Sequence, residues 1–119
     1  MTEDSLTQLT RRLVAFRDDR DWRQFHTLKN LLLSVSLEAA ELLELAQWKS
    51  DEDVDAAMHD PVMRERLSEE CADVLLYLLL VAERAGIDLG AAAHAKIDRN
   101  GEKYPVHKAR GSATKYTDL

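Results

Sequence analysis

The sequence is poor in residues that end helices and build tight turns, because its 119 residues include only four Gly, two Pro and one Cys. So few turn formers argue against a β fold with many turns. The single cysteine, Cys71, cannot form an intrachain disulfide, which favours a reducing compartment. The first residues, MTEDS, lack the basic and apolar regions of a signal peptide. The longest apolar run, Val74–Ala82, is far shorter than the ~20 residues that a membrane span needs. We therefore expect a cytoplasmic protein.

Positive charge is also scarce, because 16 Lys and Arg stand against 22 Asp and Glu and leave a formal net charge of −6. This balance argues against nucleic acid or an anionic membrane as the main partner. An anionic substrate would then need a metal ion or local basic groups in order to bind.

Helix-forming residues are abundant, since Ala, Leu, Glu and Arg dominate the chain. With 45% hydrophobic and 32% charged residues, the composition is that of a globular protein. Helical periodicity, capping residues and helix breakers predict four main helices, at about 5–20, 28–49, 61–85 and 89–103. We predict an all-α fold, a helical bundle of four main helices in a single domain over residues 1–119.

Local signals place the ends of these helices. Ser5 can begin the first helix as part of a capping box. Asp60 and Pro61 make a strong start for the third, because a capping side chain is followed by a residue whose missing N–H is tolerated there. The acidic segment 50–60 is expected to be a connection with at most one weak helical turn. Residues 103–119 are predicted to form a basic irregular tail.

Two pairs of acids lie on the most apolar helices. The stretch Leu31–Trp48 is apolar around most of its circumference, apart from a stripe that holds Glu38 and Glu41. Residues three apart are neighbours on one helix face. The third helix repeats the arrangement with Glu70 and Asp73. A solvated face is the ordinary interpretation of such acids, but carboxylates on helices this apolar are costly unless they have partners.

A divalent metal ion is the economical partner for these four carboxylates, because few cationic side chains lie close to them in the sequence. Carboxylates without histidine suit a hard cation, so Mg²⁺, or Mn²⁺ in its place, is favoured over Zn²⁺. Mg²⁺ held by carboxylates commonly takes phosphate oxygens as further ligands, which points to phosphoryl chemistry.

Other side chains can serve a nucleotide. Spacings of four and three place Lys96, Asn100 and Lys103 on one face of the last helix, with Tyr104 next to it. Alone they would be interpreted as a solvated face, but beside a metal site they are candidates for binding a polyphosphate. A base could stack on an aromatic ring, although rings on apolar helices more commonly belong to the core. The candidate rings are Trp22, Phe25, Trp48 and Tyr77.

This combination resembles the MazG-like superfamily of all-α nucleoside triphosphate pyrophosphohydrolases. Glu38-Ala-Ala-Glu41 followed by Glu70-Cys-Ala-Asp73 is similar to the E-x-x-E … E-x-x-D signature of that superfamily, and the similarity is closest to its dCTP pyrophosphatase branch. The stretches that carry the resemblance cover most of the chain beyond Arg20, namely 20–33, 41–51, 69–89 and 96–119.

The resemblance implies Mg²⁺-dependent hydrolysis of a deoxynucleoside triphosphate, dCTP or a 5-modified dCTP, to the monophosphate and pyrophosphate, as in nucleotide pool sanitation. It implies four metal ligands, which are Glu38, Glu41, Glu70 and Asp73. It also implies substrate contacts near the base from Trp22, His26, Trp48 and Tyr77, and near the phosphates from Lys96, Asn100, Lys103 and Tyr104. Family members are homodimers or homotetramers with sites between subunits. We expect Glu41 to orient or deprotonate the attacking water, with Glu44 as the other option.

The sequence departs from the family pattern in two places and leaves two alternatives open. Leu37 stands where many superfamily members have a further acid, and Lys103 replaces the usual arginine before Tyr-Pro, which keeps the charge but loses the bidentate fork. The helix before Arg20 matches poorly, so the choice of base is open. The alternatives are a related hydrolase acting on dUTP or on nucleoside diphosphates, and a non-catalytic helical interaction module whose acids are solvated.

Overall fold

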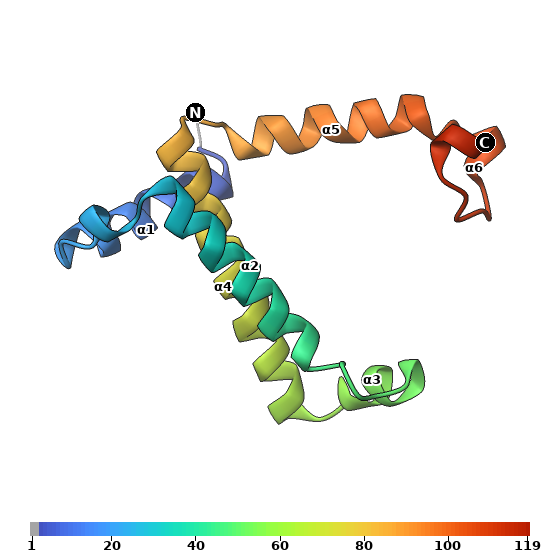
Figure 1. The fold of residues 1–119 in the computed structure, drawn as a ribbon, viewed down its shortest axis with the longest axis horizontal. Coiled ribbons are helices and arrows are strands. Elements are labelled where there is room, and N and C mark those ends of the chain that lie inside the picture. Colours follow the sequence, from blue (N-terminus) through green and yellow to red (C-terminus); the bar gives the residue numbers. More distant parts are fainter. Residues whose placement is uncertain (1–2) are drawn as a thin grey trace. The chain divides into compact units, whose positions relative to one another are not determined.

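The structure is a computed structural model that describes residues 3–119, and over that range it contains helices and no strand (Figure 1). Its four long helices are α1 (Ser5–Asp19), α2 (Leu28–Glu44), α4 (Pro61–Ala85) and α5 (Leu89–Lys103). Shorter helical segments lie between and after them, namely η1 (Arg23–Phe25), α3 (Asp51–Ala57), α6 (Val106–Ala109) and η2 (Tyr116–Asp118). These elements confirm the predicted all-α class and its four main helices.

The chain divides into two compact units, one that ends at Gly86 and one that runs from Ile87 to Leu119. The first unit contains α1 to α4, and the second contains α5, α6 and η2. The single domain over residues 1–119 stays a prediction.

Capping chemistry sets most helix boundaries where the sequence predicts them. The Thr27 side chain accepts a hydrogen bond from the N–H of Asn30 at the start of α2. Asp60 accepts from the N–H of Val62 at 3.0 Å, directly before the proline that opens α4. That helix ends at Gly86, whose φ of +69° lies in the left-handed region that favours glycine.

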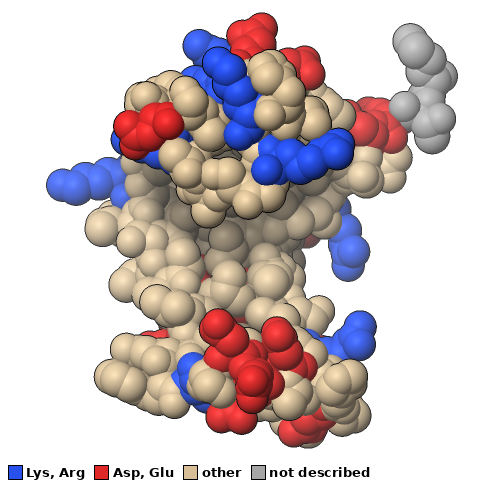
Figure 2. Space-filling model, turned by 90° about the vertical axis from the view of Figure 1, so that its right-hand side faces the viewer, with Lys and Arg blue, Asp and Glu red and all other residues tan. Residues whose placement is uncertain are grey.

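Three local predictions are wrong in detail. The first helix is capped by Asp4, which accepts from the N–H of Thr7 at 2.8 Å. The second helix ends at Glu44 and not near residue 49, because the following residues form tighter three-residue turns and then Ser50 caps the next helix. The segment 51–57 is a seven-residue helix, α3, since its acidic first turn complements the helix dipole. Figure 2 shows acidic side chains gathered over α3.

The tail is more ordered than predicted. It contains α6 and the short helix η2, separated by a turn at Gly111, whose φ is +72°. The hydroxyl of Ser112 donates to the hydroxyl of Thr114 and accepts from its N–H within that turn. Residues 103–119 are basic, as expected, but they are not irregular throughout.

The core of the first unit lies where α4 packs against α2 and α1. Its buried apolar side chains are Leu31, Leu79, Leu80 and Ala82. One charged side chain is buried with them: Arg17 of α1 is 4% exposed and donates to Glu83 of α4 at 2.9 Å. Because a buried charge needs a partner, this ion pair fixes α1 to α4.

The apolar circumference of α2 predicts a helix that is buried on most sides, and this prediction is not met within one chain. Several of its leucines are more than half exposed, including Leu37 at 65% and Leu43 at 63%. Within residues 3–119, no helix combines the length and the apolar character that crossing a membrane requires.

Candidate active site

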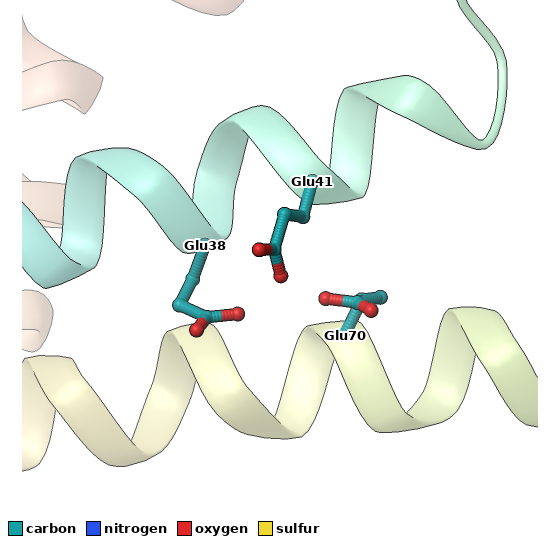
Figure 3. A group of neighbouring side chains, drawn as sticks. All are labelled: Glu38, Glu41 and Glu70. Atoms are coloured by element: carbon teal, nitrogen blue, oxygen red, sulfur yellow. The ribbon is translucent and has the colours of Figure 1, made fainter.

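Three of the four predicted metal ligands meet between α2 and α4. Glu38 and Glu41 project from one face of α2, and Glu70 projects from the facing side of α4, so that the three carboxylates point toward one another (Figure 3). Each carboxylate offers one oxygen, and these oxygens lie within 4.8 Å of one another. The three-residue spacing aligns the two acids of α2, and the packing of α2 on α4 adds the third.

The cluster holds negative charge with little compensation from side chains. One oxygen of Glu38 and one of Glu70, Oε2 in each, is buried and has no hydrogen-bond partner among the described residues. Burial, then a hydrogen bond with Glu41 and the negative charges of the neighbouring acids, raise the pKa of Glu38 above its ordinary value of 4.5. The pKa of Glu70 is raised for similar reasons, again with burial first, and only Arg66 acts weakly in the other direction.

This arrangement fits a hard divalent cation. The three donors are all carboxylate oxygens, and they converge from two helices. Two of the three side chains have a buried oxygen without a hydrogen-bond partner in the part of the chain that the structure describes. Oxygen-only donor sets suit Mg²⁺ or Mn²⁺ and not Zn²⁺.

Asp73 is not one of the three carboxylates whose oxygens converge within 4.8 Å. Its negative charge contributes to the raised pKa of both Glu38 and Glu70, which places it close to them. Its own side chain is exposed and lines a neighbouring cavity. A ligand role for Asp73 therefore stays a prediction.

A cavity of about 150 Å³ lies between α1, the segment after it, and α4. Three side chains that the resemblance assigns to the base, Trp22, His26 and Tyr77, meet in its wall. Its other lining residues are Leu13, Phe16, Arg17, Asp73, Leu76 and Leu80. The cavity is therefore mostly apolar and aromatic, with polar groups at a few places, and Asp73 joins its wall to the carboxylate cluster.

Among the residues that line this cavity, His26 has a buried ring nitrogen without a hydrogen-bond partner in the described part of the chain. Its Nδ1 is buried and has no hydrogen-bond partner within residues 3–119. Burial, and then the positive charge of Arg17, lower the pKa of His26 below its ordinary value of 6.5. The imidazole therefore keeps a hydrogen-bonding atom that no group of the described residues uses.

The contribution of α1 to the cavity was not predicted from the sequence. Phe16 packs edge to face on Trp22, with ring centres 5.8 Å apart, and Arg17 supplies the only buried charge of the described core. A signal was present, because Arg17 follows Leu13 by four residues and so lies on the apolar face of its helix.

Other predicted residues are not brought to the site. Trp48 lies beyond the end of α2, is 89% exposed and is absent from the cavity lining that the described residues form. Glu44 is exposed at the last position of α2, outside the three-carboxylate group. In the second unit, three predicted phosphate ligands are exposed along α5 and the fourth is its C-terminal cap; these are Lys96, Asn100, Lys103 and Tyr104. Their role stays a prediction.

Comparison with known proteins agrees with this fold. Residues 33–119 match the model of the MazG-like family, and the chain belongs to that family. The dCTP pyrophosphatase 1 of Rattus norvegicus is 47% identical over 117 residues, which cover 98% of this chain and 69% of the rat protein. The human dCTP pyrophosphatase 1 is 44% identical over 117 residues, with the same coverage of both chains.

A solved structure supports the same relationship. The crystal structure of a pyrophosphatase from Archaeoglobus fulgidus DSM 4304 superimposes with a TM-score of 0.80 at 38% identity, covering 88% of this chain and 96% of the archaeal one. The resemblance to MazG-like pyrophosphohydrolases, predicted from the acidic motifs, is thereby confirmed.

Proposed function

We propose that this protein hydrolyses dCTP to dCMP and pyrophosphate in a reaction that depends on Mg²⁺. The protein is a nucleoside triphosphate pyrophosphohydrolase by its family and by its relatives, which are named as dCTP pyrophosphatases. The observation that carries the finer proposal is the cluster of Glu38, Glu41 and Glu70, with its partnerless buried oxygens, next to an aromatic cavity.

The carboxylates hold the metal ion in this proposal. Glu38, Glu41 and Glu70 supply one oxygen each, and Asp73 is the fourth ligand. When bound, Mg²⁺ supplies positive charge to the phosphate oxygens and lowers the pKa of a water molecule. Glu41 is the exposed member of the three, whereas Glu38 and Glu70 are half-buried. This difference supports Glu41 as the group that orients or deprotonates the attacking water.

The aromatic cavity takes the base. Trp22 and Tyr77 offer flat apolar surfaces for stacking, and His26 offers a hydrogen-bonding atom to the edge of the base. The leucines of the wall can contact an apolar group at position 5 of a pyrimidine, so 5-modified dCTP belongs to the proposed substrates. Removal of such nucleotides would serve nucleotide pool sanitation.

We also propose a homodimer or homotetramer. Five leucines of α2 are at least 40% exposed, namely Leu28, Leu32, Leu33, Leu37 and Leu43. Exposed apolar side chains gathered on one helix are typical of an interaction surface. A second copy of the chain can cover them, because symmetric association is the commonest way to bury such a surface. Trp48 and the basic face of α5 can then belong to sites between subunits.

Two substitutions test the metal ligands. Glu41→Gln and Asp73→Asn should fold, and both should lose Mg²⁺-dependent release of pyrophosphate from dCTP. Glu65→Gln is a matched control, because this acid lies on α4 outside the three-carboxylate group and is exposed. Full activity in Glu41→Gln or Asp73→Asn would overturn the assignment of ligands.

The alternatives predict different outcomes. A non-catalytic interaction module would show no thermal shift with Mg²⁺ and dCTP, and no hydrolysis. A related hydrolase would keep the metal dependence but favour dUTP or a nucleoside diphosphate.

A further inference from the structure

The C-terminal segment of the second unit folds back on the end of α5. The N–H of Ala109 donates to Pro105 and that of Ser112 donates to Ala109, and the chain then turns at Gly111 in a left-handed conformation. The N–H of Asp118 donates to Lys115 at 2.8 Å and closes η2. Tyr116 is the first residue of η2, and its ring lies against Lys103 and Tyr104 at the end of α5.

Tyr116 there contacts the two residues at which α5 ends. The Nζ of Lys103 lies 4.9 Å from the centre of the Tyr116 ring, within the range of a cation–π interaction. The rings of Tyr104 and Tyr116 are 5.8 Å apart and meet edge to face at 76°. The two tyrosines are 39% and 40% exposed, so both remain accessible to solvent while they contact each other.

We infer that Tyr116 is a positioning residue that holds the Lys103 ammonium and the Tyr104 ring for the phosphates of the nucleotide. This inference rests on the proposed function and on the role near the phosphates that the family resemblance predicts for Lys103 and Tyr104.

The chemistry of the contact supports such a role. A lysine side chain has four flexible bonds and loses rotamer freedom when it binds a phosphate. An aromatic ring restricts that freedom without accepting a conventional hydrogen bond, so the three N–H donors of the ammonium stay available. Lys103 lacks the rigid fork of an arginine, and the fixed ring compensates for part of that lost preorganisation.

Steady-state kinetics with Mg²⁺ and dCTP test the inference on the full chain. Removing the ring with Tyr116→Leu should raise KM by about three- to tenfold, from the loss of one cation–π contact and one ring pair, with kcat changed by less than about twofold. Tyr116→Phe keeps the ring and should restore the KM of the wild type. Lys108→Gln is the matched control for charge, because it removes a lysine of α6 that has no contact with Tyr116 among the described cation–π pairs.

A double-substitution cycle separates positioning from a merely structural role. In a Lys103→Gln background, Tyr116→Leu should raise KM by clearly less than it does in the wild type, because the ammonium it holds is already gone. Binding of a dCTP analogue with a methylene group between the α- and β-phosphates gives the same comparison without turnover.

The outcomes distinguish this inference from the proposed function. An unchanged KM in Tyr116→Leu, a loss in Tyr116→Phe as large as in Tyr116→Leu, or full additivity in the cycle would overturn the positioning role alone. An unchanged KM in Lys103→Gln would remove Lys103 from the phosphate site and the inference with it. Wild-type protein without hydrolysis of any dNTP would overturn the proposed function itself.

Discussion

Replacing Glu38 with glutamine should stabilise the metal-free protein and weaken its response to Mg²⁺. The substitution removes one negative charge from a group whose carboxylate oxygens lie within 4.8 Å of one another. At that distance and at a dielectric close to that of water, each like-charge pair costs about 1 kcal/mol. Because the cluster is partly open to solvent, the gain from relieving two pairs is about 1–2 kcal/mol, which raises Tm by several degrees for a domain of this size.

Thermal unfolding in EDTA and in excess Mg²⁺, at one protein concentration, measures both effects. In EDTA, the Tm of Glu38→Gln should lie above that of the wild type. Addition of Mg²⁺ should raise the Tm of the wild type more than that of the variant, because the variant has lost one of its carboxylate ligands. Glu65→Gln is again the control and should change neither value. A variant that melts lower than the wild type in EDTA, or that keeps the full Mg²⁺ shift, would refute the electrostatic account of the cluster.

Three further predictions concern pH, the buried ion pair and association. The folded-state pKa values of Glu38 and Glu70 are raised above 4.5, so the contribution of these two groups to folding stability is complete below that pH and is lost as pH rises through the folded pKa. When the pH is lowered from 7 to 5 in EDTA, the free energy of unfolding measured by urea titration should therefore increase more for the wild type than for Glu38→Gln. Glu83→Ala leaves the buried Arg17 with only Asp18 as a partner, and should lower the free energy of unfolding by about 1–3 kcal/mol; no loss would mean that the pair does not fix α1 to α4. Leu37→Lys places a charge on the exposed face of α2 and should shift the mass measured by light scattering toward the monomer, whereas an unchanged mass would place the subunit interface elsewhere.

The sequence predicts the parts of the fold that local chemistry decides. Asp60 caps α4 where it was expected, Thr27 caps α2 at the predicted start of that helix, and Gly86 ends α4 in a left-handed conformation. Prediction fails where neighbouring residues can serve the same local role. Asp4 takes the capping role given to Ser5, and Ser50 begins a new helix where α2 could have continued.

The candidate site is predictable only in part for a related reason. Glu38 and Glu41 share a helix face by spacing alone, but Glu70 joins them through the packing of α2 on α4. The contribution of α1 to the cavity depends on contacts between helices, which the periodicity of a single helix does not contain. The expected burial of α2 failed within one chain because an apolar face does not specify whether the same chain or another covers it.

The most direct test of the account is hydrolysis of a panel of dNTPs, including 5-substituted dCTP, by the wild-type protein with and without Mg²⁺, with the products separated. The account predicts Mg²⁺-dependent formation of dCMP and pyrophosphate, with dCTP or its 5-substituted form the best substrate. Formation of dCDP and phosphate, turnover that is equal in EDTA, or no turnover of any dNTP would contradict it.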